Sequence, residues 1–225
     1  MNIRAWADSL PKHFFAWGSV NAYPRNAERF CAVMDSVQGM TTPSNMLMLN
    51  LAVQCMKPGE IYLEVGTWRG ATLIGALLDN KKATGFAIDN DTMNDHDGDD
   101  RSSQDVWREN LERFGLAHQA FYIDGSVPEV WSRPGLAHNP VGVYFFDGDK
   151  STPEAAYDGL AGVLPFLADE ALILIDDANE MNIALAAAKL ERENPKQLMR
   201  LLWLPTPGNC WTCFWDGVMA LAFKR

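Results

Sequence analysis

Acidic residues recur along this chain at the ends of short, wholly apolar runs. Glu64 lies in the first run, and the later runs are followed in turn by Asp89, Asp124, Asp147 and the pair Asp176–Asp177. Successive acids stand 23 to 35 residues apart, which is roughly the length of one strand and one helix. If the runs are parallel strands of one sheet, these side chains meet in the crevice at its carboxyl edge, where such sheets bind ligands.

A group of carboxylates at one edge restricts what the site can bind. Carboxylates that lie close together raise one another's pKa, so they require a positive or donor-rich partner. Hydroxyls, an amine, a sulfonium or a divalent metal would all serve. Taken singly, each acid is explained equally well as a cap of the helix that follows it. Five such positions in succession favour a ligand.

The turn after the first apolar run is rich in glycine. It reads Glu64-Val-Gly66-Thr67-Trp68-Arg-Gly70, and glycine permits a tight turn and a close approach of the backbone to a ligand. In the dinucleotide pattern G-x-G-x-x-G the second glycine admits the pyrophosphate, and Trp68 stands in its place. The loop therefore favours a nucleoside without phosphates. Asp89 stands where an acid binds ribose hydroxyls in such folds.

Apolar runs and helical patterns alternate from residue 60 onward. The runs predict strands at 61–65, 84–88, 120–123, 141–146 and 171–175, and helical spacing predicts helices at 71–78, 106–114, 153–164 and 181–192. Apolar runs without alternation are typical of parallel strands that are buried on both faces. Runs at 198–204 and 218–223 predict an antiparallel strand pair at one end of the sheet.

The first 57 residues have a different character. They predict helices over 26–37 and from Thr42 to about Met56, with threonine as the cap and proline at the first helical position. We therefore divide the chain into a helical extension, residues 1–57, and a doubly wound, Rossmann-like α/β domain, residues 58–225.

Aromatic residues are dense in the extension, at Trp6, Phe14, Phe15 and Trp17. Core packing is the simplest interpretation. The alternatives are a cap over the substrate or a homodimer contact, because a monomer rarely exposes so much aromatic surface.

Composition excludes several classes of protein. With 48% hydrophobic residues in 225, the chain has the apolar surface of a folded domain and not of a disordered tail. Nineteen Lys and Arg against 29 Asp and Glu give a net charge of −10, which argues against a nucleic-acid partner. No apolar stretch resembles a signal peptide or a membrane span, so we expect a cytoplasmic protein without a membrane partner.

The four cysteines are too few and too scattered for a disulfide framework. Cys210-Trp-Thr-Cys213 has the spacing of a redox motif but lacks the strand-to-helix context of one. A zinc site would need a second pair of ligands nearby. We expect free thiols.

Taken in order, the segments E-V-G-T-W-R-G, A-I-D, Y-I-D-G-S, F-F-D-G-D-K and I-D-D resemble the motifs of class I S-adenosylmethionine-dependent methyltransferases. The tail W-D-G-V-M-A-L-A-F-K-R is similar to the closing antiparallel strand of that fold. The resemblance is greatest to the small-molecule O-methyltransferases grouped with macrocin O-methyltransferase and the methyltransferase 24 family. It covers roughly residues 58–225.

The resemblance implies roles for particular residues. Glu64 and Gly66 would line the methionine part of S-adenosylmethionine, Asp89 would bind the ribose, and Asp124 with Ser126 would face the adenine. The cofactor-binding residues that it implies are Glu64, Gly66, Thr67, Trp68, Gly70, Asp89, Asp124, Gly125, Ser126 and Asp147. For Trp68, core packing is favoured over contact with the substrate or the cofactor.

The resemblance also implies a metal site and a base. In catechol-type and caffeoyl-coenzyme-A-type O-methyltransferases, an acid of the fourth strand and a pair after the fifth bind magnesium, which implies Asp147, Asp176 and Asp177 here. Such oxygen ligands suit Mg²⁺ or another hard divalent cation. The implied catalytic residues are Asp147 and Lys150, with Lys150 in place of the usual histidine and acting as base if burial lowers its pKa. The acceptor would be a hydroxyl of a small molecule.

Two other functions stay open. A nicotinamide-dependent oxidoreductase has a similar fold, although Trp68 speaks against it and no Tyr-x-x-x-Lys pair is present. A non-catalytic S-adenosylmethionine-binding protein would use Gly66 and Asp89 without turnover. The segment 90–101 predicts a solvated lid that would bring His96 to the substrate on closing, whereas surface or structural roles are expected for His13, His118 and His138.

Overall fold

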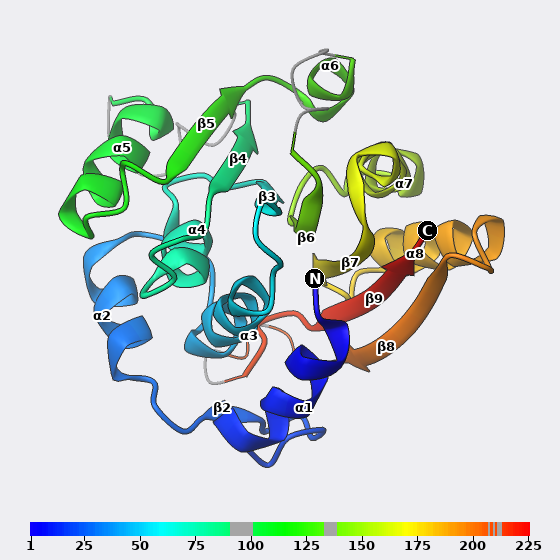
Figure 1. The fold of residues 1–225 in the computed structure, drawn as a ribbon, viewed down its shortest axis with the longest axis horizontal. Helices are drawn as coiled ribbons and strands as arrows, with labels where there is room; N and C mark the ends of the chain where they lie inside the picture. The colour runs from blue at the N-terminus through cyan, green and yellow to red at the C-terminus, as the bar shows by residue number, and fades with distance from the viewer. Residues whose placement is uncertain (91–100, 133–138, 207, 209, 211–212) are drawn as a thin grey trace.

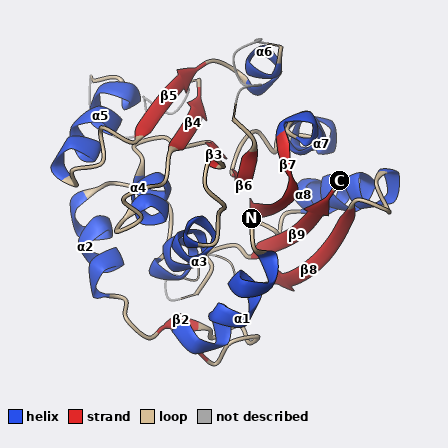
Figure 2. Cartoon of the chain, in the orientation of Figure 1, coloured by secondary structure: helices blue, strands red, loops and turns tan. Residues whose placement is uncertain are grey.

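The computed structural model describes residues 1–90, 101–132, 139–206, 208, 210 and 213–225. Within them a seven-stranded sheet in the order β5-β4-β3-β6-β7-β9-β8 runs through the molecule, with helices on both of its faces (Figures 1 and 2). Its strands are β3 (Ile61–Val65), β4 (Gly85–Asp89), β5 (Ala120–Asp124), β6 (Val141–Phe146), β7 (Leu167–Asp176), β8 (Leu198–Leu204) and β9 (Val218–Lys224).

Strands β3 to β7 are parallel, whereas β9 is antiparallel to both β7 and β8. This arrangement confirms the predicted doubly wound sheet and the antiparallel pair at its end. The strand β7 begins four residues earlier than predicted. It does so because its pairing with β6 continues back to Leu167, which lies opposite Val141, while its pairing with β9 continues back to Glu170.

The two faces of the sheet are covered by separate helix layers. Tyr62, Phe145 and Leu172 pack into one core with the N-terminal helices, α4 and α5, whereas the other face packs with α6 to α8. These helices are α1 (Ile3–His13), α2 (Glu28–Ser36), α3 (Pro43–Gln54), α4 (Ala71–Leu77), α5 (Ser103–Arg113), α6 (Val127–Trp131), α7 (Pro153–Gly162) and α8 (Met181–Glu193), with a short 3₁₀ helix η3 (Leu164–Phe166).

The N-terminal segment packs against the sheet. Trp6 and Phe14 are buried, and the Phe14 ring contacts those of Trp17 and Phe214 at centroid distances of 5.0 and 5.9 Å. Core packing is therefore confirmed for Trp6 and Phe14. Phe15, in the short strand β1 (Phe14–Phe15) that pairs with β2 (Tyr23–Pro24), is 50% exposed. A cap or a homodimer contact stays a prediction.

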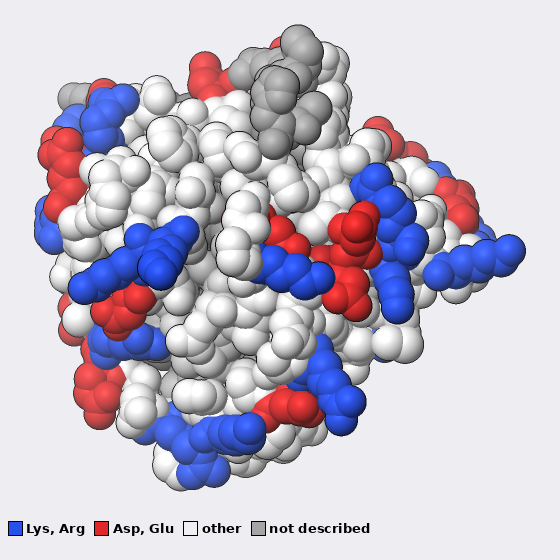
Figure 3. Space-filling model, in the orientation of Figure 1, with Lys and Arg blue, Asp and Glu red and all other residues white. Residues whose placement is uncertain are grey.

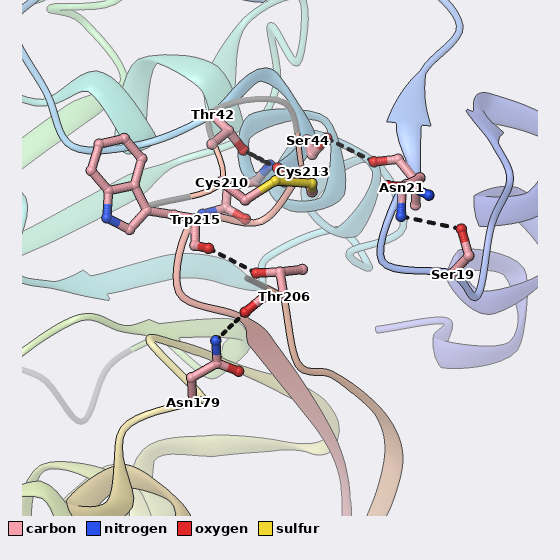
Figure 4. The surroundings of a disulfide bond; sticks show 11 residues. Ser19, Asn21, Thr42, Ser44, Asn179, Thr206, Cys210, Cys213 and Trp215 are labelled. Carbon is pink, nitrogen blue, oxygen red and sulfur yellow. Dashed lines mark hydrogen bonds between the residues drawn. A yellow bond between two sulfur atoms is a disulfide. The ribbon is translucent and has the colours of Figure 1, made fainter. Parts of the chain in front are cut away.

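A disulfide joins Cys210 and Cys213 (Figure 4), so the expectation of free thiols was wrong for this pair. The chain turns back on itself between β8 and β9, and the Cys213 N–H donates to the Cys210 carbonyl at 3.2 Å. This turn brings the two Cα atoms to 5.6 Å, within the range that a disulfide spans. Cys31 and Cys55 are free thiols as expected. The Thr42 hydroxyl at the start of α3 donates to the Cys213 carbonyl at 2.5 Å.

No helix within the described ranges is long and apolar enough to cross a membrane. On the face shown in Figure 3, Lys and Arg side chains are interspersed with Asp and Glu and do not form a continuous basic stripe. The partners predicted from composition stay predictions.

Candidate active site

A cavity of about 700 Å³ opens at the carboxyl edge of the sheet. The loops after β3, β4, β5 and β6 form much of its wall, and the segment before α3 and part of α7 complete it. The residues implied by the sequence that line it are Gly66, Thr67, Trp68, Asp89, Gly125, Ser126, Asp147 and Lys150. Residues from four strand ends therefore share one cavity.

Five other implied residues lie outside the lining: Glu64, Gly70, Asp124, Asp176 and Asp177. Asp124 is exposed at the end of β5, which is an edge strand of the sheet. Gly70 caps α4 in a left-handed conformation, and a Cβ there would lie 2.9 Å from the Trp107 ring. Glu64 is buried beneath the cavity with no exposed surface. Asp124, Gly70 and Glu64 are therefore not placed to contact a ligand in the cavity directly.

Gly66 is required where the loop after β3 crosses the end of β6. Its φ is +84°, and a Cβ at this position would lie only 2.0 Å from the Asp147 carbonyl oxygen. The Gly66 N–H donates to the Ile88 carbonyl, and the Asp147 N–H donates to the Val65 carbonyl. The loop is thus held against both neighbouring strands, and only glycine fits this close approach.

Trp68 adopts a left-handed conformation, with φ +44°, which is uncommon for a bulky residue. Its backbone N–H donates to Asp89 Oδ2 at 2.7 Å, which links the loop after β3 to the acid at the end of β4. The Trp68 side chain lines the cavity, and its buried indole N–H has no hydrogen-bond partner among the described residues. This placement favours contact with a ligand over the core-packing alternative.

Glu64 lies in a buried set of hydroxyl groups. The Tyr62 hydroxyl donates to Glu64 Oε2 at 2.6 Å, and the Thr72 hydroxyl donates to Oε1 at 3.3 Å. Burial raises the pKa of Glu64 to about 7, and hydrogen bonds from nearby hydroxyls oppose the rise. Because Thr72 itself lines the cavity, Glu64 supports the wall from behind.

Glu64→Gln is expected to stabilise the ligand-free protein at pH 8. The folded pKa is higher than the ordinary 4.5, so the folded state holds its proton more tightly. This contribution to stability is complete below pH 4.5 and is lost as the pH rises to about 7. The difference between these two pKa values corresponds to about 3 kcal/mol of stability. A glutamine at this position does not lose that stability as the pH rises. Urea unfolding of both proteins at pH 5 and 8 measures this effect as the difference between their free energies of unfolding. An equal difference at the two pH values would contradict the prediction.

Lys150 lies between two of the acids predicted to bind metal. Its Nζ donates to Asp147 Oδ1 at 3.0 Å and to Asp177 Oδ2. Burial lowers the pKa of Lys150, but the Asp147 and Asp177 carboxylates outweigh burial and raise it above its ordinary value. A group held as an ammonium ion does not meet the condition under which Lys150 was expected to act as a base.

The three acids do not converge on one point. Asp176 Oδ1 accepts from the Asn45 side chain of α3 at 3.3 Å, while Asp147 and Asp177 contact Lys150. Burial, with a further contribution from the two other carboxylates, raises the pKa of Asp176 well above its ordinary value. Burial also raises the pKa of Asp147, to about 6, against the opposing effect of Lys150. Within the described ranges no three acidic, histidine or cysteine side chains are arranged to hold a metal ion. The residues therefore do not fit the magnesium site that the resemblance implied.

Sequence reasoning missed part of the wall. Gln38, Gly39, Met40 and Thr41, in the turn between α2 and α3, line the cavity, as do Val127 and Pro128 at the start of α6. The pattern Ser126-Val-Pro-Glu129 is a capping box and signals α6. For the turn between α2 and α3 the sequence carries no comparable signal. Residues 91–100, with His96 and most of the expected lid, lie outside the described residues, as does His138; His13 and His118 are exposed.

The comparisons with known proteins agree with this geometry. Residues 63–178, more than half of the chain, match the methyltransferase 24 family, a methyltransferase domain. The chain belongs to this family. It is thus an S-adenosylmethionine-dependent methyltransferase, as the motifs implied, and the oxidoreductase alternative is set aside.

Solved methyltransferases share the fold at low identity. An O-methyltransferase from Bacillus cereus in complex with SAH is similar, with a TM-score of 0.62 and 15% identity over 89% of this chain and 92% of that one. The O-methyltransferase NovP has a TM-score of 0.60 and 16% identity, over 81% of each chain. A search of curated protein sequences gives no significant match.

Proposed function

We propose that this methyltransferase binds S-adenosylmethionine in the 700 Å³ cavity and transfers its methyl group to a hydroxyl oxygen of a small molecule. In this proposal the methionine part lies along Gly66 and Thr67, and Asp89 binds the ribose. The adenine lies against Ser126 and Pro128. The observation that carries the proposal is that these residues, from three separate strand ends, line one cavity.

An oxygen acceptor suits the groups beside Asp147. The Lys150 ammonium lines the same cavity and donates to Asp147, so it can also donate to an acceptor oxygen that gains negative charge. The acceptor oxygen forms its bond to the methyl carbon as the carbon–sulfur bond breaks. The electron pair of that bond neutralises the sulfonium, and the hydroxyl proton passes to the Asp147 carboxylate. Orientation of the two reactants contributes most of the acceleration.

The test uses S-adenosylmethionine with a labelled methyl group and a panel of phenols, sugars, hydroxylated polyketides and hydroxylated amino acids, with amines and thiols of matched shape as controls. The expected result is label in a product whose NMR spectrum shows an O-methyl group. Label in an amine or thiol alone would contradict the oxygen acceptor. Failure of the protein to bind S-adenosylmethionine would contradict the cofactor site.

A further inference from the structure

Lys150 places a positive charge where the resemblance implied a divalent metal. It stands four residues after β6, and its ammonium contacts Asp147, directly after β6, and Asp177, directly after β7. The three side chains are largely withdrawn from water, with 28%, 25% and 14% of their surfaces exposed for Lys150, Asp147 and Asp177. We infer that Lys150 is a built-in replacement for the divalent cation: its ammonium occupies the carboxylate pair, keeps metal ions out and supplies the positive charge beside the acceptor.

The chain fixes Lys150 from both sides. Asn182, at the start of α8, donates its side-chain amide to the carbonyls of Lys150 and Ser151 at 2.9 and 3.2 Å. The Ser151 N–H donates to Asp149 Oδ1 at 2.9 Å, which closes a tight turn. Thr152 then caps α7. Because the backbone at Lys150 is already fixed, placing the ammonium between the two carboxylates costs little additional conformational entropy.

The remaining acid does not complete a metal site. Asp176 faces the helix layer that contains α3, where it accepts from Asn45. The backbone of Asp177 is in the left-handed region, with φ +50°, and the Asp177 side chain contacts Lys150. Adjacent acids therefore serve different partners. A divalent cation needs several oxygen ligands around one point. Here the Lys150 ammonium already pairs with the Asp147 and Asp177 carboxylates.

The consequence of this inference for the substrate rests on the proposed function. A divalent cation can bind two neighbouring oxygens of an acceptor, as in a catechol, whereas an ammonium donates separate hydrogen bonds. The site therefore fits acceptors with a single hydroxyl and does not require a chelating pair. Methyl transfer is expected to be insensitive to EDTA and to added Mg²⁺.

Binding of Mn²⁺, followed by the EPR signal of the free ion, tests the inference without an acceptor. The wild-type protein is compared with Lys150→Ala, Lys150→Gln, Asp177→Asn and the double variant Lys150→Ala/Asp177→Asn. We expect no Mn²⁺ bound through Asp177 in the wild type, and at least about tenfold tighter binding in Lys150→Ala because a competing positive charge is gone. The double variant should lose that binding. Lys150→Gln, which keeps most of the stem, covers the case in which alanine disturbs folding.

Two results would overturn the inference. One is Mn²⁺ binding by the wild type that Asp177→Asn abolishes, because the metal would then displace Lys150. The other is absence of binding in both Lys150→Ala and Lys150→Gln, because the carboxylates would then not form a cation site. Calorimetry with S-adenosylhomocysteine on the same samples shows separately whether the cofactor site is intact, so failure of the proposed function is distinguishable.

Discussion

Gly66→Ala is expected to abolish cofactor binding and to destabilise the protein by about 4 kcal/mol or more, the range of severe backbone and core defects. The added Cβ would lie 2.0 Å from the Asp147 carbonyl oxygen, a distance at which the two backbones must separate. Both the loop after β3 and the end of β6 line the cavity, so the shift would deform the proposed methionine site. Urea unfolding and calorimetry with S-adenosylhomocysteine measure the two effects.

Gly59 supplies a matched control for this variant. Its φ is +85°, almost that of Gly66, but a Cβ there has no atom within 4 Å. Gly59→Ala therefore carries only the cost of a left-handed alanine, about 1 kcal/mol, and should leave cofactor binding intact. Equal destabilisation by the two variants would show that the close approach of the loop to Asp147 is not what requires glycine.

Asp89→Ala is expected to weaken S-adenosylmethionine binding about 100- to 1000-fold. Two effects combine: the carboxylate that would accept from the ribose hydroxyls is lost, and so is the 2.7 Å acceptor of the Trp68 N–H. Hydrogen bonds to a charged group contribute about 1.5–3 kcal/mol each. Asp89→Asn keeps one acceptor oxygen for the Trp68 N–H, so its effect should be smaller than that of alanine. Calorimetric titration gives both values.

Asp124→Asn is the comparison for that experiment. Asp124 also follows a strand of the parallel sheet, but it is exposed and outside the cavity lining. Its substitution should change the affinity by less than about twofold, within the usual range of surface changes. Similar losses for Asp124→Asn and Asp89→Asn would support the adenine contact implied by the motifs and would contradict the cavity as described.

The sheet was predictable because its signals are local. Apolar runs such as 61–65 and 141–146 coincide with β3 and β6, and the rule that parallel strands present their carboxyl ends together places Asp89 and Asp147 at one edge. The same rule did not distinguish Asp124. The cavity lies where the strand order reverses between β3 and β6, whereas β5 is at the edge of the sheet.

What the sequence did not predict depends on contacts between distant segments. The turn at residues 38–41 lines the cavity only because α3 packs against α4, and nothing in its own composition indicates that contact. The Cys210–Cys213 disulfide depends on how the chain returns to β9. Lys150 was recognised as unusual, but only its place between Asp147 and Asp177 shows that it serves as an ion partner there.

The most direct measurement is a crystal structure of the protein with S-adenosylhomocysteine. We expect an arrangement with the ribose hydroxyls at hydrogen-bond distance from Asp89, the adenine against Ser126 and Pro128, and the sulfur near Gly66 on the side of Lys150. A nucleoside bound away from the ends of β3 and β4, or turned so that its sulfur faces away from Asp147, would contradict it.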